Sequence, residues 1–274
     1  MNCLNLCDLI EVKDFQNKTL EELISVSDIA DLERLYIGSY FCSQYFLMMD
    51  FIDELSLFLK KTPFKLTLVI PVFTEKDLIS AKEKIDFILK ELPVDEVTVN
   101  DVGMLSALSL DYSIRLNLGR LFFKDERDIR AQYLYQKTTH PAEFGRIDDY
   151  FKQYPVYCAE LDPISKVIDL QNDTDIRVAL HEPFCYLTTG NICKYASVDI
   201  KTDHKFRPNA PCKKECQKIH EIYTPDSSDY KLYRIGRTIY FPTTKPQIVN
   251  GHIDRTVFFP FFELMKIRKE GVNV

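Results

Sequence analysis

The fold class follows from KLTLVIPVFTEKDLISAKEKIDFILKELPVDEVTVND, residues 65–101. The run 65–72 is apolar and rich in branched side chains, which is typical of a strand buried on both faces. Thr74 can cap the helix that follows, and Pro93 ends it. Apolar side chains share one face of that helix at Leu78, Ala81, Ile85, Ile88 and Leu89. A further strand is predicted over 95–101, so this stretch is a strand–helix–strand unit.

The same alternation extends through most of the chain. Other strands are predicted over 34–42, 114–122, 154–162 and 175–182, and other helices over 18–33, 43–61 (with Ser43 as N-cap) and 102–110. The β-rich pieces 231–241 and 255–264 are expected to supply late strands. Alternation of this kind implies parallel strands joined by right-handed crossovers.

We therefore expect an α/β fold of the (β/α)8-like, TIM-type barrel class, either regular or distorted. Neither G-x-G-x-x-G nor G-x-x-x-x-G-K-[ST] follows any predicted strand, which argues against a dinucleotide or nucleoside-triphosphate fold. Without a low-complexity linker, a single barrel domain over residues 1–274 is expected. Its active face would lie at the carboxyl ends of the strands.

Composition limits the class of protein. With 46% hydrophobic and 28% charged residues, the chain resembles ordinary soluble globular proteins. It has no apolar run long enough for a membrane span, and residues 1–30 lack the features of a secretory signal, so a cytoplasmic location is expected. The net charge of −6 disfavours non-specific nucleic-acid binding. In a reducing compartment, the eight cysteines would be ligands, reactive groups or core residues rather than disulfides.

Four of those cysteines, Cys185, Cys193, Cys212 and Cys216, fall within residues 181–216, HEPFCYLTTGNICKYASVDIKTDHKFRPNAPCKKEC. Thiolates bind zinc and iron–sulfur clusters. The pair Cys212 and Cys216 has polar neighbours, so burial in a core explains it poorly. Cys193 follows a predicted turn and is a third candidate ligand. Zinc remains an alternative because His204 and His220 are nearby in the sequence. Cys3 and Cys7 instead have leucine neighbours and are expected to be buried.

Other polar residues lie at or just beyond the ends of predicted strands. A barrel would bring Asp101, Arg120, Glu160 and His181 to the same rim as Cys42 and Cys185. Glu160, His181, Asp101 and Arg120 are the candidates for binding a small carboxylate or transferring protons. The alternative is that they form rim ion pairs and strand-end caps.

At these residues the sequence resembles the collagenase-like U-type peptidase family. The motif elements of that family correspond here to His181, Cys185, Thr189-Gly190-Asn191, Cys193, Cys212 and Cys216. Residues 99–105, 117–130 and 159–162 also look like strand-end signatures of the family. Within it, the segment LYIGSYFCS, residues 35–43, is similar to the UbiV-type iron–sulfur proteins of oxygen-independent ubiquinone hydroxylation.

The resemblance implies a 4Fe–4S cluster held by Cys42, Cys193, Cys212 and Cys216, with Cys185 as the alternative fourth ligand. It also implies a related protein subunit as partner, in a hetero-oligomer, and a small aromatic molecule or an RNA as substrate. Two alternatives remain open. One is a peptidase that uses a Cys185–His181 pair, and the other is a non-catalytic binding protein stabilised by zinc.

Overall fold

The structure, a computed structural model, describes residues 1–27, 29–111, 113–123, 142–143, 153–163, 167–169, 176–198, 200–201, 204–208, 212–218, 220–225 and 231–270. Residues 28, 124–130, 175, 199, 202–203 and 209–211, which belong to segments used above, lie outside these residues. None of the described helices has both the length and the apolar character needed to cross a membrane.

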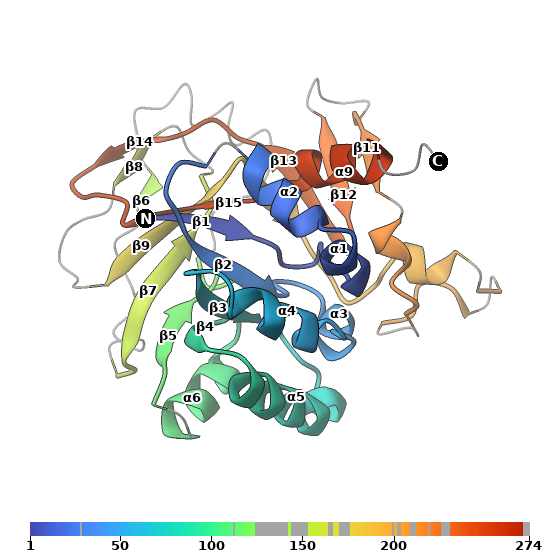
Figure 1. Cartoon of the computed structure of the whole chain (residues 1–274), viewed down its shortest axis with the longest axis horizontal. Coiled ribbons are helices and arrows are strands. Elements are labelled where there is room, and N and C mark those ends of the chain that lie inside the picture. Colours follow the sequence, from blue (N-terminus) through green and yellow to red (C-terminus); the bar gives the residue numbers. More distant parts are fainter. Residues whose placement is uncertain are drawn as a thin grey trace.

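A closed barrel of eight parallel strands forms the centre of the molecule (Figure 1). Around the barrel the strands follow the order β1-β15-β9-β7-β5-β4-β3-β2. Their bounds are β1 Asn2–Asn5, β2 Leu32–Gly38, β3 Lys65–Ile70, β4 Val94–Val99, β5 Arg115–Leu118, β7 Val156–Leu161, β9 Arg177–Glu182 and β15 Arg255–Phe258. The N-terminal and C-terminal strands pair directly and close the barrel. The expected α/β class with a closed parallel barrel is therefore confirmed.

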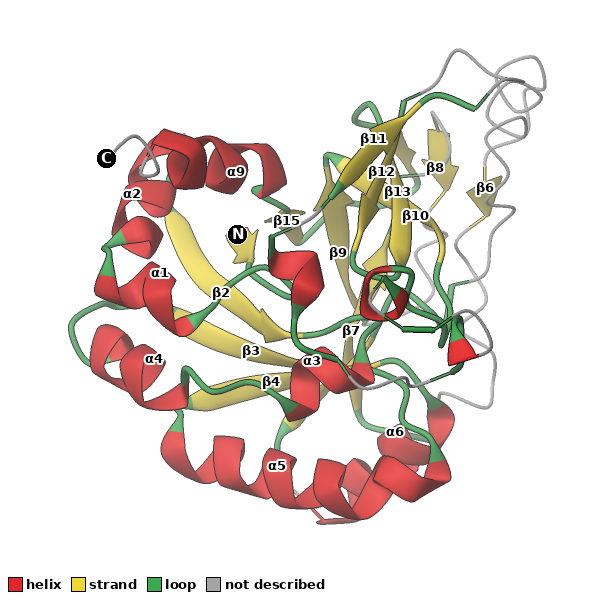
Figure 2. Cartoon of the chain, turned by 90° about the vertical axis from the view of Figure 1, so that its right-hand side faces the viewer, coloured by secondary structure: helices red, strands yellow, loops and turns green. Residues whose placement is uncertain are grey.

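Helices cover the outside of this barrel (Figure 2). They are α1 Val12–Gln16, α2 Thr19–Val26, α3 Ser43–Leu47, α4 Ile52–Leu59, α5 Leu78–Glu91 with the preceding 3-10 turn η1 Glu75–Asp77, α6 Val102–Asp111 and α9 Phe261–Glu270. The predicted face of α5 is largely confirmed, since Ala81, Ile85 and Ile88 are buried. Their spacing of three and four residues places them on one side of the helix.

Two helix predictions are wrong in their extent. Residues 43–61 form two helices, because both Met49 and Phe51 are buried and a continuous helix would place side chains two residues apart on nearly opposite faces. The residue that caps the first of these helices is Cys42, not Ser43. The helix expected over 18–33 ends at Val26, since β2 begins at Leu32.

Two further sheets accompany the barrel. An antiparallel sheet has the order β10-β13-β12-β11, with bounds Phe184–Thr188, Thr238–Pro242, Leu232–Ile235 and Glu221–Tyr223. A small parallel sheet has the order β14-β8-β6, with bounds Gln247–Val249, Val167–Asp169 and Ala142–Glu143. The expectation of late strands is met by β15 in the barrel, whereas residues 231–241 form the β12–β13 hairpin of the antiparallel sheet. Directly after β9 the chain continues into β10 rather than a helix, so the strict alternation stops there.

A network of charged residues fills one part of the barrel interior. Glu96 on β4 is fully buried and accepts hydrogen bonds from Arg255 Nη1 and Nη2 at 2.7 and 3.2 Å. Arg34 lies 3.3 Å from the same carboxylate and forms a two-bond ion pair with Asp95. Asn117 donates to Glu96 over 3.1 Å. Buried charges of this kind are tolerated only when they are paired and hydrogen-bonded.

This network predicts a pH dependence of stability. Burial raises the pKa of Glu96, but the hydrogen bonds and charge of Arg255, together with the charge of Arg34, outweigh it, so the pKa lies below 4.5. A lowered folded pKa stabilises the protein at pH values above the unfolded pKa, and this stability is lost as pH falls through the folded pKa. We expect the difference in unfolding free energy between wild type and Glu96→Gln to be constant near neutrality and to shrink below about pH 4.5. Urea titrations at several pH values would measure it, and a pH-independent difference would contradict this account.

Gly38 ends β2 and leads into the segment that carries Cys42. Its φ is +106°, and an added Cβ would lie 2.1 Å from the carbonyl oxygen of Val69 on the neighbouring strand. Because that obstacle is backbone, Gly38→Ala is expected to lower the unfolding free energy by more than about 2 kcal/mol. Gly190→Ala is the matched control, since nothing lies within 4 Å of its added Cβ, and its effect should stay within about 0.5 kcal/mol. Equal stability of the two variants in urea would refute this role of Gly38.

Candidate metal centre

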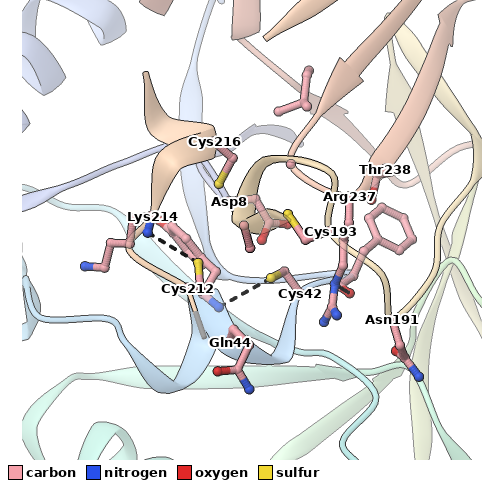
Figure 3. Close-up of a pocket in the computed structure, with 15 residues that line it drawn as sticks. Asp8, Cys42, Gln44, Asn191, Cys193, Cys212, Lys214, Cys216, Arg237 and Thr238 are labelled. Atoms are coloured by element: carbon pink, nitrogen blue, oxygen red, sulfur yellow. Dashed lines mark hydrogen bonds between the residues drawn. The ribbon is translucent and has the colours of Figure 1, made fainter. Parts of the chain in front are cut away.

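Four cysteines line a single pocket at the carboxyl end of the barrel (Figure 3). They are Cys42, Cys193, Cys212 and Cys216. The pocket encloses about 630 Å³ of space, part of which is open to solvent. Its cysteines come from three segments distant in sequence: the β2–α3 connection, the turn after β10, and the C-x3-C segment before β11. The fold therefore unites the four residues that the resemblance implied as ligands.

The Cys42 segment is held from both sides. Ser39 Oγ donates to Asp8 over 2.5 Å and accepts the backbone N–H of Cys42 at 2.7 Å. On the other side, buried Arg237 donates from Nε to the Phe41 carbonyl at 3.0 Å and from Nη2 to Ser43 Oγ at 3.1 Å. These contacts leave little freedom for the backbone on either side of Cys42.

Cys193 lies in the turn between β10 and the 3-10 turn η2, Tyr195–Ser197. Its carbonyl accepts a hydrogen bond from Ser197 Oγ at 3.0 Å. The hydroxyl of Tyr195 donates to the carbonyl of Arg234 over 3.1 Å, which ties this turn to β12 of the antiparallel sheet. The antiparallel sheet thus positions Cys193 relative to the barrel.

Cys212 and Cys216 flank Lys214, which adopts a left-handed conformation with φ 59° before the 3-10 turn η4, Glu215–Gln217. The left-handed residue reverses the chain so that both sulfurs border the same pocket. Gln217 then donates from Nε2 to the carbonyl of Asp8 at 2.9 Å. Asp8 therefore contacts both the Cys42 segment and the Cys216 segment.

Burial favours the neutral thiol at three of the four cysteines. Burial raises the pKa of Cys42 to about 11, and it also raises those of Cys212 and Cys216. Negative charge on Cys42, Cys212, Asp8 or Cys193 would raise the pKa of Cys216 further. Binding of a metal requires thiolates, so it would release protons from this site. Burial also raises the pKa of Asp8 to about 7.

Two of the four rim candidates lie inside the barrel rather than at the cysteine pocket. Glu160 is fully buried and accepts hydrogen bonds from Tyr40 at 2.6 Å and Thr98 at 2.5 Å. His181 Nε2 lies 3.0 Å from the same carboxylate. Burial and the charge of Arg120 lower the pKa of His181, so the ring is neutral near pH 7 and Nε2–H donates to Glu160.

The other two rim candidates have structural partners. Arg120 is buried, forms an ion pair with Asp162, and donates to the carbonyl of Phe184 at 3.1 Å. Asp101 accepts the backbone N–H of Met104 at 2.7 Å and so caps α6; burial raises its pKa. Both residues match the ion-pair and capping alternative, and neither lines the cysteine pocket.

The remaining cysteines and histidines lie elsewhere. Cys185 is fully buried on β10 in a cluster with Leu232 and Phe241, and it does not line the pocket. His204 is exposed and His220 packs against the ring of Phe261; neither lines the pocket. As expected from their leucine neighbours, Cys3 and Cys7 are buried, with exposures of 0% and 1%.

Sequence reasoning missed Asp8 and Arg237. Asp8 lies three residues beyond the end of β1, a strand that was itself missed, because the apolar run at residues 1–10 suggested only burial. Arg237 follows Gly236, whose φ of +58° forms the turn between β12 and β13. The dipeptide Ile-Gly before Arg237 could have indicated that turn, but nothing local indicates that the guanidinium contacts residues 41 and 43.

No family model, curated protein or solved structure gives a significant match to this chain. The resemblance to the U-type peptidase family therefore rests on the motif residues quoted above. The interpretation of the pocket as a metal centre rests on the four cysteines that line it.

Proposed function

We propose that the four cysteines of the pocket hold a 4Fe–4S cluster and that the protein transfers electrons at the carboxyl face of its barrel. The single observation that carries this proposal is that Cys42, Cys193, Cys212 and Cys216 line one pocket although they come from three distant segments. Soft thiolate donors in a set of four suit such a cluster. The process would be an oxygen-independent hydroxylation, with a related subunit as partner.

A cluster and a single zinc ion require different spacings of their sulfur ligands. Zinc binds each thiolate at about 2.3 Å in a tetrahedron, which brings the sulfurs to within about 4 Å of one another. Among the residues that the structure describes, no three Cys, His, Asp or Glu side chains are grouped closely enough to hold a single metal ion. In a 4Fe–4S cluster each cysteine binds a different iron, so its sulfurs are further apart. The count of iron and acid-labile sulfide distinguishes the two kinds of site, because a zinc site contains neither.

Backbone N–H groups already point at two of the sulfurs. Tyr45 donates to Cys42 Sγ at 3.4 Å, and Lys214 donates to Cys212 Sγ at 3.3 Å. Hydrogen bonds to ligand sulfurs adjust the reduction potential of a bound cluster. With four cysteine ligands no iron would be open to substrate, so the cluster would supply one-electron transfer. Asp8 and Arg237 would position its ligands.

A peptidase finds less support in the same geometry. Hydrolysis by a cysteine needs an accessible thiol beside a base. Cys185 is fully buried against Leu232 and Phe241, and His181 donates to Glu160 from inside the barrel. Cys185 is therefore inaccessible to a substrate, and His181 is engaged with Glu160 rather than with Cys185. This favours the electron-transfer function.

Spectroscopy under anaerobic conditions tests the proposed role. The purified protein is expected to be brown, to lose visible absorbance on reduction with dithionite, and to show an EPR signal only in the reduced state. Reoxidation should restore the original spectrum, because electron transfer requires a reversible couple. A brown protein whose visible absorbance does not fall with dithionite and return on reoxidation would argue for a purely structural cluster.

A further inference from the structure

A second, open pocket adjoins the cysteine pocket and is rich in lysine. It is lined by Glu11, Val12, Lys13, Met48, Asp50, Lys213, Lys214 and Lys218. Four lysines face two carboxylates there, a local excess of positive charge in a chain with a net charge of −6. We call this feature the lysine pocket. A basic surface on an acidic protein indicates an acidic binding partner.

The lysine pocket and the cysteine pocket share a wall. Lys214 lines both of them, and its backbone N–H donates to Cys212 Sγ at 3.3 Å. Lys213 and Lys214 lie between the two cysteines of the C-x3-C pair (Figure 3 labels Lys214). A molecule docked on these lysines would therefore lie directly beside the cluster ligands.

Much of this positive charge is not neutralised. The two carboxylates of the pocket are engaged, Asp50 with Lys214 at 2.9 Å and Glu11 with Lys13 at 2.6 Å. Lys213 and Lys218 are exposed, and neither makes an ion pair within the described part of the chain. Exposed lysines on flexible stems steer a charged protein over a distance, whereas tight chelation of a small anion favours the rigid fork of arginine.

We propose that the lysine pocket is the docking surface for an acidic electron-carrier protein that reduces the cluster. This inference rests on the proposed function. The carrier would be oxidised by one electron, and a cluster held by the four cysteines would be reduced by that electron. No proton or atom is transferred. Docking beside Cys212 shortens the path of the electron, and charge complementarity raises the rate of encounter.

The test measures binding of a fluorescently labelled plant-type 2Fe–2S ferredoxin, an acidic one-electron carrier, to the anaerobically purified holoprotein. At low ionic strength the charge-reversal variant Lys213→Glu/Lys218→Glu is expected to bind ferredoxin with a Kd at least about tenfold higher than that of the wild type. Its binding should also depend much less on salt concentration. The matched control is Lys60→Glu/Lys61→Glu. These exposed lysines follow α4 and precede β3, so they lie at the opposite end of the barrel.

Iron and sulfide are counted in every variant, which separates the two proposals. If the wild type holds no cluster, the proposed function fails. If all variants hold the cluster, three results would overturn the docking proposal. In the first, the wild type does not bind ferredoxin. In the second, both double variants weaken ferredoxin binding equally. In the third, inorganic phosphate displaces ferredoxin far more than chloride does at the same ionic strength. The last result would identify a small-anion site instead.

Discussion

Cys193→Ala and Cys212→Ala are each expected to lose the cluster, with iron falling from about four atoms per chain to near zero. The reason is geometric, because the two residues come from different sides of the pocket and no other described cysteine lines it. Cys185 is buried on β10 and cannot replace either residue without unfolding part of the antiparallel sheet. Iron analysis and the visible spectrum after anaerobic purification measure the effect.

Cys3→Ala and Cys158→Ala are the matched controls. Both side chains are thiols that are fully buried in the barrel core, away from the pocket. We expect both variants to retain wild-type iron and to lose only some stability through the small cavity that each creates. Full iron content in Cys212→Ala, or equal iron loss in the controls, would refute the assignment of the ligands.

Glu96→Gln is expected to lower the unfolding free energy by about 3–5 kcal/mol. Its carboxylate is the charged partner of Arg255 and also lies beside Arg34. Glutamine keeps one oxygen that can accept from Arg255 but removes the negative charge, so the buried guanidinium loses its carboxylate partner. A loss of this size is a large share of the total stability of a domain, which is about 5–15 kcal/mol. Urea unfolding at pH 7 measures it.

Glu221→Gln serves as the control for that variant. Glu221 forms an ion pair with Lys194 at 2.5 Å, but both side chains are partly exposed, so the pair is screened by water. We expect a loss below about 1 kcal/mol. If Glu96→Gln lowers the unfolding free energy no more than Glu221→Gln does, the barrel interior does not depend on the Glu96–Arg255 ion pair.

The parts of the fold that could be predicted are those with strong local patterns. The apolar face of α5 and the buried run of β3 are specified by residues within a few positions of each other. The short β1 and β10 segments carry no such signal, because a short apolar run suits a strand, a buried helix turn or a core loop equally well. The choice of β10 as a strand depends on pairing with β13, more than fifty residues later.

The candidate site divides in the same way. Cys212 and Cys216 could be identified because their neighbours are polar, which makes burial in a core a poor explanation. Asp8 and Arg237 could not, since their roles depend on contacts with residues 39, 41 and 43, on other segments of the chain. Lys213 and Lys214 are adjacent in the sequence, but only the fold brings Lys13 to the same pocket.

The central claim is that Cys42, Cys193, Cys212 and Cys216 together hold iron. The most direct test is a count of iron and acid-labile sulfide per chain in protein purified without oxygen. The account predicts about four of each, and near zero of each when Cys42 is replaced by alanine. Stoichiometric zinc without sulfide in the wild type, or unchanged iron and sulfide in Cys42→Ala, would contradict it.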